Sequence, residues 1–262
     1  MNSSGRASWG TMFRVLMRMQ FARLRRNWRP YVIVSAVMPA GIVLLLYFTN
    51  HHMPRFQKED IITGAMLLSE SIATIVMLSQ YIAWLKETRA LDHYRTLPVS
   101  LEMLVTVLAT AYGLFAWPGI ALITLESRYL EHLSVHFSLW LIALWVLTGL
   151  GMGSVGTIIG LLAPDEGLAG LFGNLLMMAI LFLDMLPLSS LGPWTAVLWL
   201  LPSTAPLHLL KSIMFHVPIH PLLWGAGTIL YAACGLGLSA YLVKNLLDTP
   251  LPERPSFAVH FG

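Results

Sequence analysis

The sequence predicts an all-α integral membrane protein with six transmembrane helices, an N-terminal amphipathic interfacial helix and re-entrant half-helices before the last span. Three observations predict it: the composition, the length of the apolar runs and the uneven distribution of basic residues. Of the 262 residues, 56% are hydrophobic and only 11% are charged, whereas soluble domains carry about 25% charged residues. No polar stretch is long enough to form a separate core, so we expect residues 1–262 to form a single transmembrane domain.

Residues 1–29 are expected to form a cytoplasmic leader that contains the amphipathic helix. Between residues 11 and 28, apolar side chains recur every three or four positions with arginines between them; they are Met12, Val15, Leu16, Met19 and Leu24. A basic helix with this pattern lies in the membrane interface and is attracted to lipid headgroups. The alternative is a basic flank without a surface helix, but the helical spacing and Trp28 favour the helix.

Six apolar runs are long enough to cross a bilayer, which requires about 20 helical residues. They cover residues 30–49, 61–85, 101–125, 137–163, 168–188 and 221–243. Each run is apolar on all sides, as expected for a helix surrounded by lipid or by other helices. A helix satisfies its own backbone hydrogen bonds, which lipid cannot do. We therefore predict a six-span bundle over residues 30–243 and a cytoplasmic tail over residues 244–262.

A seventh apolar stretch, residues 194–215, has a different character. It contains Pro202 and Pro206, and then His208 and Lys211. Two prolines four positions apart disfavour a straight helix, and two half-helices that enter the membrane from one side fit the pattern better. If this stretch were a seventh span, the C-terminus would lie outside the cell.

The distribution of basic residues predicts the orientation. Twelve of the 16 lysines and arginines fall in the leader, in the loop after the second span and in the tail, and four fall in the opposite loops. Because basic residues concentrate in cytoplasmic loops, both termini are expected in the cytoplasm.

No motif for catalysis or nucleotide binding is found. The chain lacks a G-x-x-x-x-G-K-[ST] phosphate loop and an H-E-x-x-H pair, and it has one cysteine, Cys234. Gly151, Gly153 and Gly156 match G-x-G-x-x-G, but they lie inside a predicted span, where small residues allow close helix packing. The formal net charge of +3 is too small to indicate nucleic-acid binding. We therefore do not expect an enzyme.

The loop of residues 85–100 carries the most specific signal. Leu91, Tyr94 and Leu97 fall on one helical face, Pro98 ends the helix, and Ser100 is suited to cap the next span. A short amphipathic helix with an exposed, mixed-charge face is suited to docking a cytoplasmic partner. A solvated connector is the alternative.

The segments Glu87-Thr88-Arg89-Ala90-Leu91 and Leu97-Pro98-Val99-Ser100 resemble the cytoplasmic loop of ABC type-2 exporter permeases. The basic leader, the six-span order and the proline-broken segment near Pro202 and Pro206 also resemble this family. The chain departs from it at Arg89-Ala90, where relatives often carry glycine.

The resemblance implies a permease of the prokaryotic plasma membrane that pairs with a second permease and with two separate ATPase subunits. The loop would be the coupling helix that contacts the ATPase, through Glu87, Thr88, Arg89, Leu91 and Tyr94. This chain would bind no cofactor, because ATP and Mg²⁺ would belong to the ATPase. An ion-gradient-driven secondary transporter or a channel is the alternative function.

Two acidic residues fall inside predicted spans, Glu70 in the second and Asp184 in the fifth. Because a charge in the membrane is costly, such residues are functional candidates, and both are predicted to line the substrate path. A structural acid at Glu70 and an interfacial acid at Asp184 are the alternatives. His132 and His136 have the spacing of metal ligands on one helix face, but only Glu131 lies near them, and we predict no metal site.

Overall fold

The computed structural model describes residues 9–26, 28–49, 53–95, 100–184, 198–199 and 201–248. Its helices are α1 (Trp9–Arg26), α2 (Trp28–Thr49), α3 (Arg55–Ser71), the π-helix η1 (Ile72–Met77), α4 (Leu78–Glu87), α5 (Ala90–Arg95), α6 (Leu101–Tyr129), α7 (Leu139–Leu162), α8 (Glu166–Asp184), α10 (Thr204–Phe215) and α11 (Pro221–Asp248). The described residues contain no β-strand. The predicted all-α class is confirmed.

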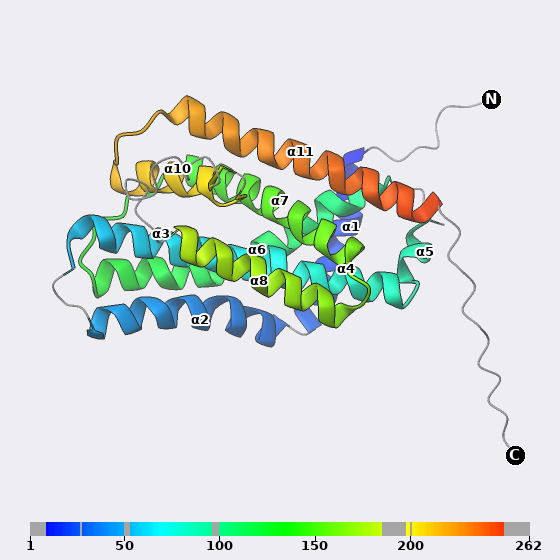
Figure 1. The fold of residues 1–262 in the computed structure, drawn as a ribbon, viewed down its shortest axis with the longest axis horizontal. Helices are drawn as coiled ribbons and strands as arrows, with labels where there is room; N and C mark the ends of the chain where they lie inside the picture. Colours follow the sequence, from blue (N-terminus) through cyan, green and yellow to red (C-terminus); the bar gives the residue numbers. More distant parts are fainter. Residues whose placement is uncertain are drawn as a thin grey trace, which may run out of the picture.

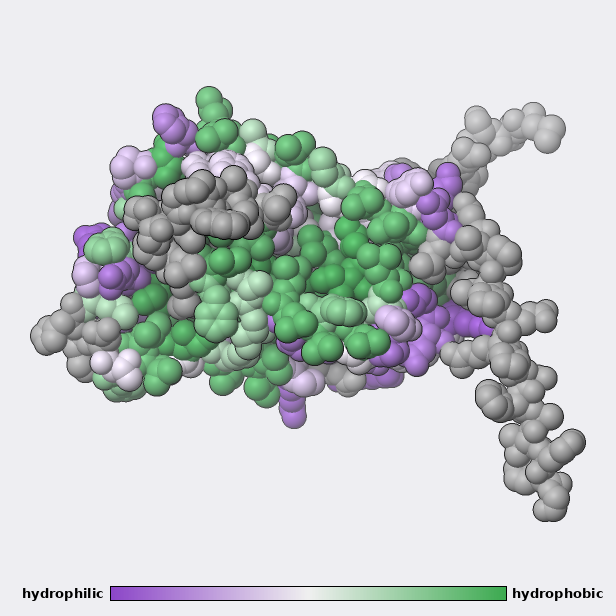
Figure 2. Space-filling model, in the orientation of Figure 1, coloured by the Kyte–Doolittle hydropathy of each residue, from purple (hydrophilic) through white to green (hydrophobic). Residues whose placement is uncertain are grey.

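Within the part of the chain that the structure describes, six helices are long and apolar enough to cross a membrane, which confirms the predicted number of spans. Figure 1 shows them side by side along the long axis, with α1, α5 and the end of α11 at one end of the bundle and α10 at the other. We call the first end the basic end, because α1 carries Arg14, Arg18, Arg23, Arg25 and Arg26 there. Figure 2 shows hydrophobic residues over the middle of one face, with hydrophilic residues toward its ends.

The second span lies at the centre of the bundle. α3, η1 and α4 form one continuous helix, Arg55–Glu87, and 89% of its apolar window is buried, against 28% for α2 and 22% for α11. A helix of 33 residues is roughly 50 Å long, so it extends beyond a hydrocarbon core of about 30 Å at its ends. The outer helices present apolar side chains on their free faces, as lipid-facing helices do.

A proline in α2 is compensated by a neighbouring helix. Pro39 cannot donate a hydrogen bond to the carbonyl oxygen of Ser35 one turn earlier. The Ser69 hydroxyl of α3 donates to that oxygen at 2.7 Å, and is also within 3.2 Å of the Ala116 carbonyl oxygen of α6. Such compensation allows prolines inside membrane helices. Here it also joins three spans.

Glycines of α7 pack against the central helix and α6, as the packing interpretation predicts. A Cβ atom at Gly153 would lie 2.6 Å from the Ala109 Cβ of α6, and one at Gly156 would overlap the Thr74 carbonyl oxygen of η1. Gly160 has the same relation to the Ser79 carbonyl oxygen of α4. These glycines permit a close approach of backbones that no side chain would allow.

The segment before the last span is described only in part. Residues 194–197 and 200 of the predicted half-helices lie outside the described residues. α10 has 12 residues, which is too short to cross a bilayer, and the Lys211 Nζ atom forms an ion pair of 2.8 Å with the Asp60 Oδ1 atom of α3. The re-entrant arrangement stays a prediction.

The loop between α6 and α7 corrects the expectation that His132 and His136 lie on one helix face. His132 and His136 follow the end of α6 at Tyr129 and precede α7, so they do not share a helix face. His132 has a φ of 51°, which breaks the helical path.

Candidate functional site

The corner between α4 and α5, at the basic end, contains the residues that the sequence singles out for partner binding. The Thr88 amide donates to the Trp84 carbonyl oxygen at 2.9 Å, and the Arg89 amide donates to that of Lys86 at 3.2 Å. Arg89 then adopts a φ of 57°, in the left-handed region that favours glycine. The chain reverses there, and α5 begins at Ala90. Arg89 therefore stands where the resembling loops often carry glycine, and its left-handed backbone is one that glycine adopts readily.

The corner separates the five predicted contact residues into two sets. Glu87, Thr88 and Arg89 are consecutive and exposed. Leu91 is only 4% exposed and packs in a cluster with residues of five other helices, and Tyr94 packs against the same cluster. Leu91 and Tyr94 therefore anchor α5, while Glu87, Thr88 and Arg89 form the free surface. The Ser100 cap is confirmed, since its side chain accepts from the Met103 amide at 3.3 Å; Leu97 and Pro98 lie outside the described residues.

The inner face of α1 joins α5 to the bundle. The Gln20 Nε2 atom donates to the Tyr94 hydroxyl at 3.4 Å, and Leu24 belongs to the same cluster as Leu91. A movement of α5 would therefore displace α1.

Arg23 fixes α1 to two spans. Its guanidinium carbon lies 3.4 Å from the Tyr81 ring centroid of α4, and its Nη2 atom donates to the Tyr112 hydroxyl of α6 at 3.2 Å. Cation–π contacts of this kind are stronger where water is excluded. In the sequence, Arg23 is only one of the basic residues of the leader. Its inward position on the helix, between Gln20 and Leu24, is the signal that could have identified it.

Lys86 is a second residue whose role the sequence pattern does not indicate. Its Nζ atom donates to the carbonyl oxygens of Leu161, at 2.9 Å, and of Ala163, where α7 ends. A cation at a helix C-terminus interacts favourably with the helix dipole and with unpaired carbonyl groups. Lys86 therefore joins the end of the central span to the end of α7, directly beside the exposed surface. In the sequence it only counts as one of the basic residues of the loop.

Replacing Lys86 with methionine is expected to lower the free energy of unfolding by about 1–3 kcal/mol, because two helix-terminal carbonyl groups lose a charged donor. Thermal unfolding of the purified protein in detergent measures this change. Lys244→Met is the control, since Lys244 is an exposed lysine of α11 without a hydrogen bond or ion pair among the described residues. Equal stability of the two variants would contradict the role of Lys86.

Glu70 lies inside the bundle. Its side chain has no exposed surface, and neither carboxyl oxygen has a hydrogen-bond partner among the described residues. A Cβ atom at Gly149 of α7 would lie 2.6 Å from the Glu70 Oε1 atom, and one at Gly113 of α6 would lie 3.0 Å from it. The carboxyl group thus occupies the space that two glycines leave between three spans. It can meet a substrate only if α6 and α7 move apart from α3.

Asp184 is the last described residue of α8. Its side-chain surroundings lie outside the described residues, so its predicted place on a substrate path remains a prediction. Among the described residues, no group of three His, Cys, Asp or Glu side chains is arranged to hold a metal ion.

One comparison with known proteins found a family match. A family model described as ABC-2 type transporter matches residues 11–215, from α1 to the end of α10. A search of curated proteins found no match.

Proposed function

Because the chain belongs to the ABC-2 type transporter family and is an ABC transporter permease subunit, we propose that it is the membrane subunit of an ATP-driven exporter. Its energy would come from separate ATPase subunits bound to the α4–α5 corner, which also hold the ATP and Mg²⁺. The main support is the exposed Glu87-Thr88-Arg89 surface on an anchored helix. The family generally works with ATPase partners.

The corner has the properties that force transmission requires. Leu91 and Tyr94 attach α5 to a cluster that contains residues of α1, α4 and α6. A force on the exposed surface would therefore displace these packed helices together, whereas a flexible loop would not transmit it. Lys86 and Arg23 extend this unit to α7, α4 and α6. ATP-driven closure of the ATPases would then rotate the bundle as a rigid body and expose a path beside a second permease subunit.

The proposed orientation has both termini in the cytoplasm of a prokaryotic cell and α5 facing the cytoplasm. The arginines of α1 support it, because they lie at the same end as α5 (Figure 1) and basic residues favour the cytoplasmic side. The multi-pass membrane fold itself follows from the six spans and the family.

Charge reversal at the corner tests the proposal. Arg89→Glu, alone or combined with Glu87→Lys, is expected to reduce retention of a P-loop ATPase on the tagged protein by about tenfold or more, because charge pairs across such an interface become mismatched. ATP-dependent transport should fall in parallel. Co-purification from the native host, with quantification of the retained ATPase, measures the first effect.

Arg128→Glu is the matched control, since Arg128 is an exposed arginine in the last turn of α6, at the opposite end of the bundle. The control is expected to retain the ATPase. Loss of the ATPase from both arginine variants, or from neither, would contradict the proposed docking surface. Transport that continues without any ATPase would instead favour an ion-gradient-driven transporter.

A further inference from the structure

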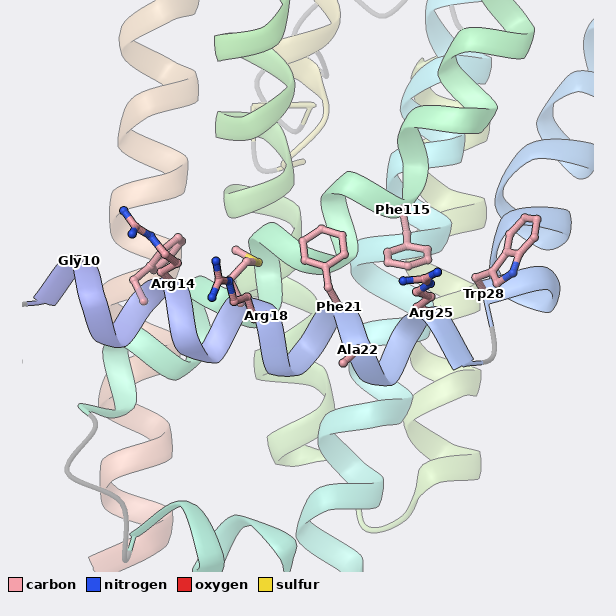
Figure 3. A pocket seen from close by; sticks show the side chains of 10 residues that line it. Gly10, Arg14, Arg18, Phe21, Ala22, Arg25, Trp28 and Phe115 are labelled. Atoms are coloured by element: carbon pink, nitrogen blue, oxygen red, sulfur yellow. The ribbon is translucent and has the colours of Figure 1, made fainter.

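A groove runs along α1 on a side that the docking surface does not use. Its volume is about 860 Å³, and it is lined by α1, Trp28 of α2 and Phe115 of α6. Figure 3 shows α1 lying across the bundle, with the Phe21 and Phe115 rings on one side of it and Arg14, Arg18 and Arg25 along its length. Cationic and apolar groups therefore line the same groove.

The arginines of the groove are available to an external anion. Arg14, Arg18 and Arg25 are spaced by four and seven positions, which puts them on one stripe of the helix. All three are exposed and none forms an ion pair or hydrogen bond with another described residue. None of the described residues that line the groove is acidic. A ligand that neutralises this stripe must supply the negative charge itself.

The apolar side of the groove indicates where that ligand comes from. The Phe21 and Phe115 ring centroids are 6.2 Å apart, and Phe21 is 37% exposed. Phe115 is the middle residue of α6, a membrane-spanning helix of 29 residues. The groove thus extends from charged groups at the membrane surface to a side chain beside the hydrocarbon core. A soluble anion would leave the rings uncovered, and a soluble protein would have to enter the membrane to cover Phe115.

We propose that this groove is a binding site for one anionic phospholipid of the surrounding membrane. The phosphate group lies between Arg14 and Arg18, with Arg25 as a further cation, and an acyl chain covers Phe21 and Phe115. The phosphate supplies the negative charge that balances the arginines, and the acyl chain supplies an apolar surface that covers the rings. The site is distinct from the docking surface and from the buried acid of the proposed substrate path, because Glu87, Arg89 and Glu70 are not among the described residues that line it.

Native mass spectrometry of the purified full-length protein tests this site. Phosphatidylglycerol and phosphatidylcholine with identical acyl chains are added in turn, and the bound fraction is measured against lipid concentration. The unmodified protein is expected to bind one phosphatidylglycerol at least tenfold more tightly than phosphatidylcholine. Arg14→Gln with Arg18→Gln should weaken phosphatidylglycerol binding roughly 30-fold, since each arginine near an anionic headgroup contributes about a factor of five.

Arg26→Gln with Arg29→Gln is the matched control. It removes two positive charges from the same region, but neither residue lines the groove. This variant is expected to bind phosphatidylglycerol within about threefold of the unmodified protein. An equal loss in both double variants would overturn the proposal in favour of diffuse surface attraction. Equal binding of the two lipids by the unmodified protein would also overturn it.

A third variant tests the apolar half of the site without changing the charge. Ala22 lines the groove and is exposed, so Ala22→Trp fills the groove while the arginines remain. It is expected to weaken phosphatidylglycerol binding by about tenfold. Unchanged binding would overturn the proposed acyl-chain position.

A cross-linking experiment identifies the occupant of the groove directly. A cysteine is placed in the groove by Phe21→Cys, in a Cys234→Ser background. Cross-linking of this cysteine to another protein chain instead of lipid would overturn the proposal.

Discussion

Replacing Gly156 with alanine is expected to destabilise the protein by about 3 kcal/mol or more, which is the upper end of the cost of overpacking a core. The added Cβ atom would overlap the Thr74 carbonyl oxygen and lie 3.1 Å from the Ile75 Cα atom. Both contacts are with backbone, so no side-chain rotation relieves them. They also fall on η1, where the wider π-helical turn of the central span lies against α7. Thermal unfolding in detergent and the yield of folded protein measure the effect.

Gly237→Ala is the control for that substitution. Gly237 lies in α11, and a Cβ atom there would meet nothing within 4 Å. Because alanine favours helices over glycine by about 1 kcal/mol, this variant should be unchanged or slightly more stable. Equal stability of the Gly156→Ala and Gly237→Ala variants would contradict the close approach of α7 to the central helix.

Replacing Glu70 with methionine is expected to raise stability by about 1–3 kcal/mol and to abolish transport. The gain follows because an apolar side chain of similar volume replaces two buried carboxyl oxygens that have no hydrogen-bond partner among the described residues. The loss follows because a buried polar group that lowers stability is retained most often where function requires it. Thermal unfolding and transport into inverted vesicles measure the two effects separately.

Glu70→Gln distinguishes the roles of charge and shape. It keeps the size and polarity of the side chain but not its acidic group. If the carboxyl group contacts the substrate or an ion, this variant also loses transport. Full transport by both variants would show that Glu70 is a structural acid and would contradict its place on the substrate path. If the unmodified protein transports without an ATPase and Glu70→Gln stops that transport, the result favours the ion-gradient alternative.

Much of the fold could be predicted because a bilayer imposes a simple rule on sequence. Any run of about 20 apolar residues must become a helix, and α2, α6, α7 and α11 follow the predicted runs within a few residues at most boundaries. The interfacial helix α1 was predicted from its periodicity in the same way. The segment around Pro202 was harder, because residues that break a helix do not specify what replaces it.

The candidate site could be predicted only in outline. Glu87 and Arg89 were identified from the loop they occupy, and the structure leaves them exposed. Leu91 and Tyr94 were chosen for the same role, but they face the bundle. Arg23 and Lys86 were not singled out, since a basic residue in a leader or a loop looks the same whether it faces solvent or a neighbouring helix.

The sequence alone determined the class of protein and the number of spans. These features depend on the solubility of each segment in water or lipid, which is a property of local composition. Only the tertiary structure decided that Glu70 lies between two glycines, that Lys86 caps α7 and that Arg23 fixes α1 to Tyr81 and Tyr112. These contacts join residues far apart in the chain, and such contacts are set by helix packing, which composition does not encode.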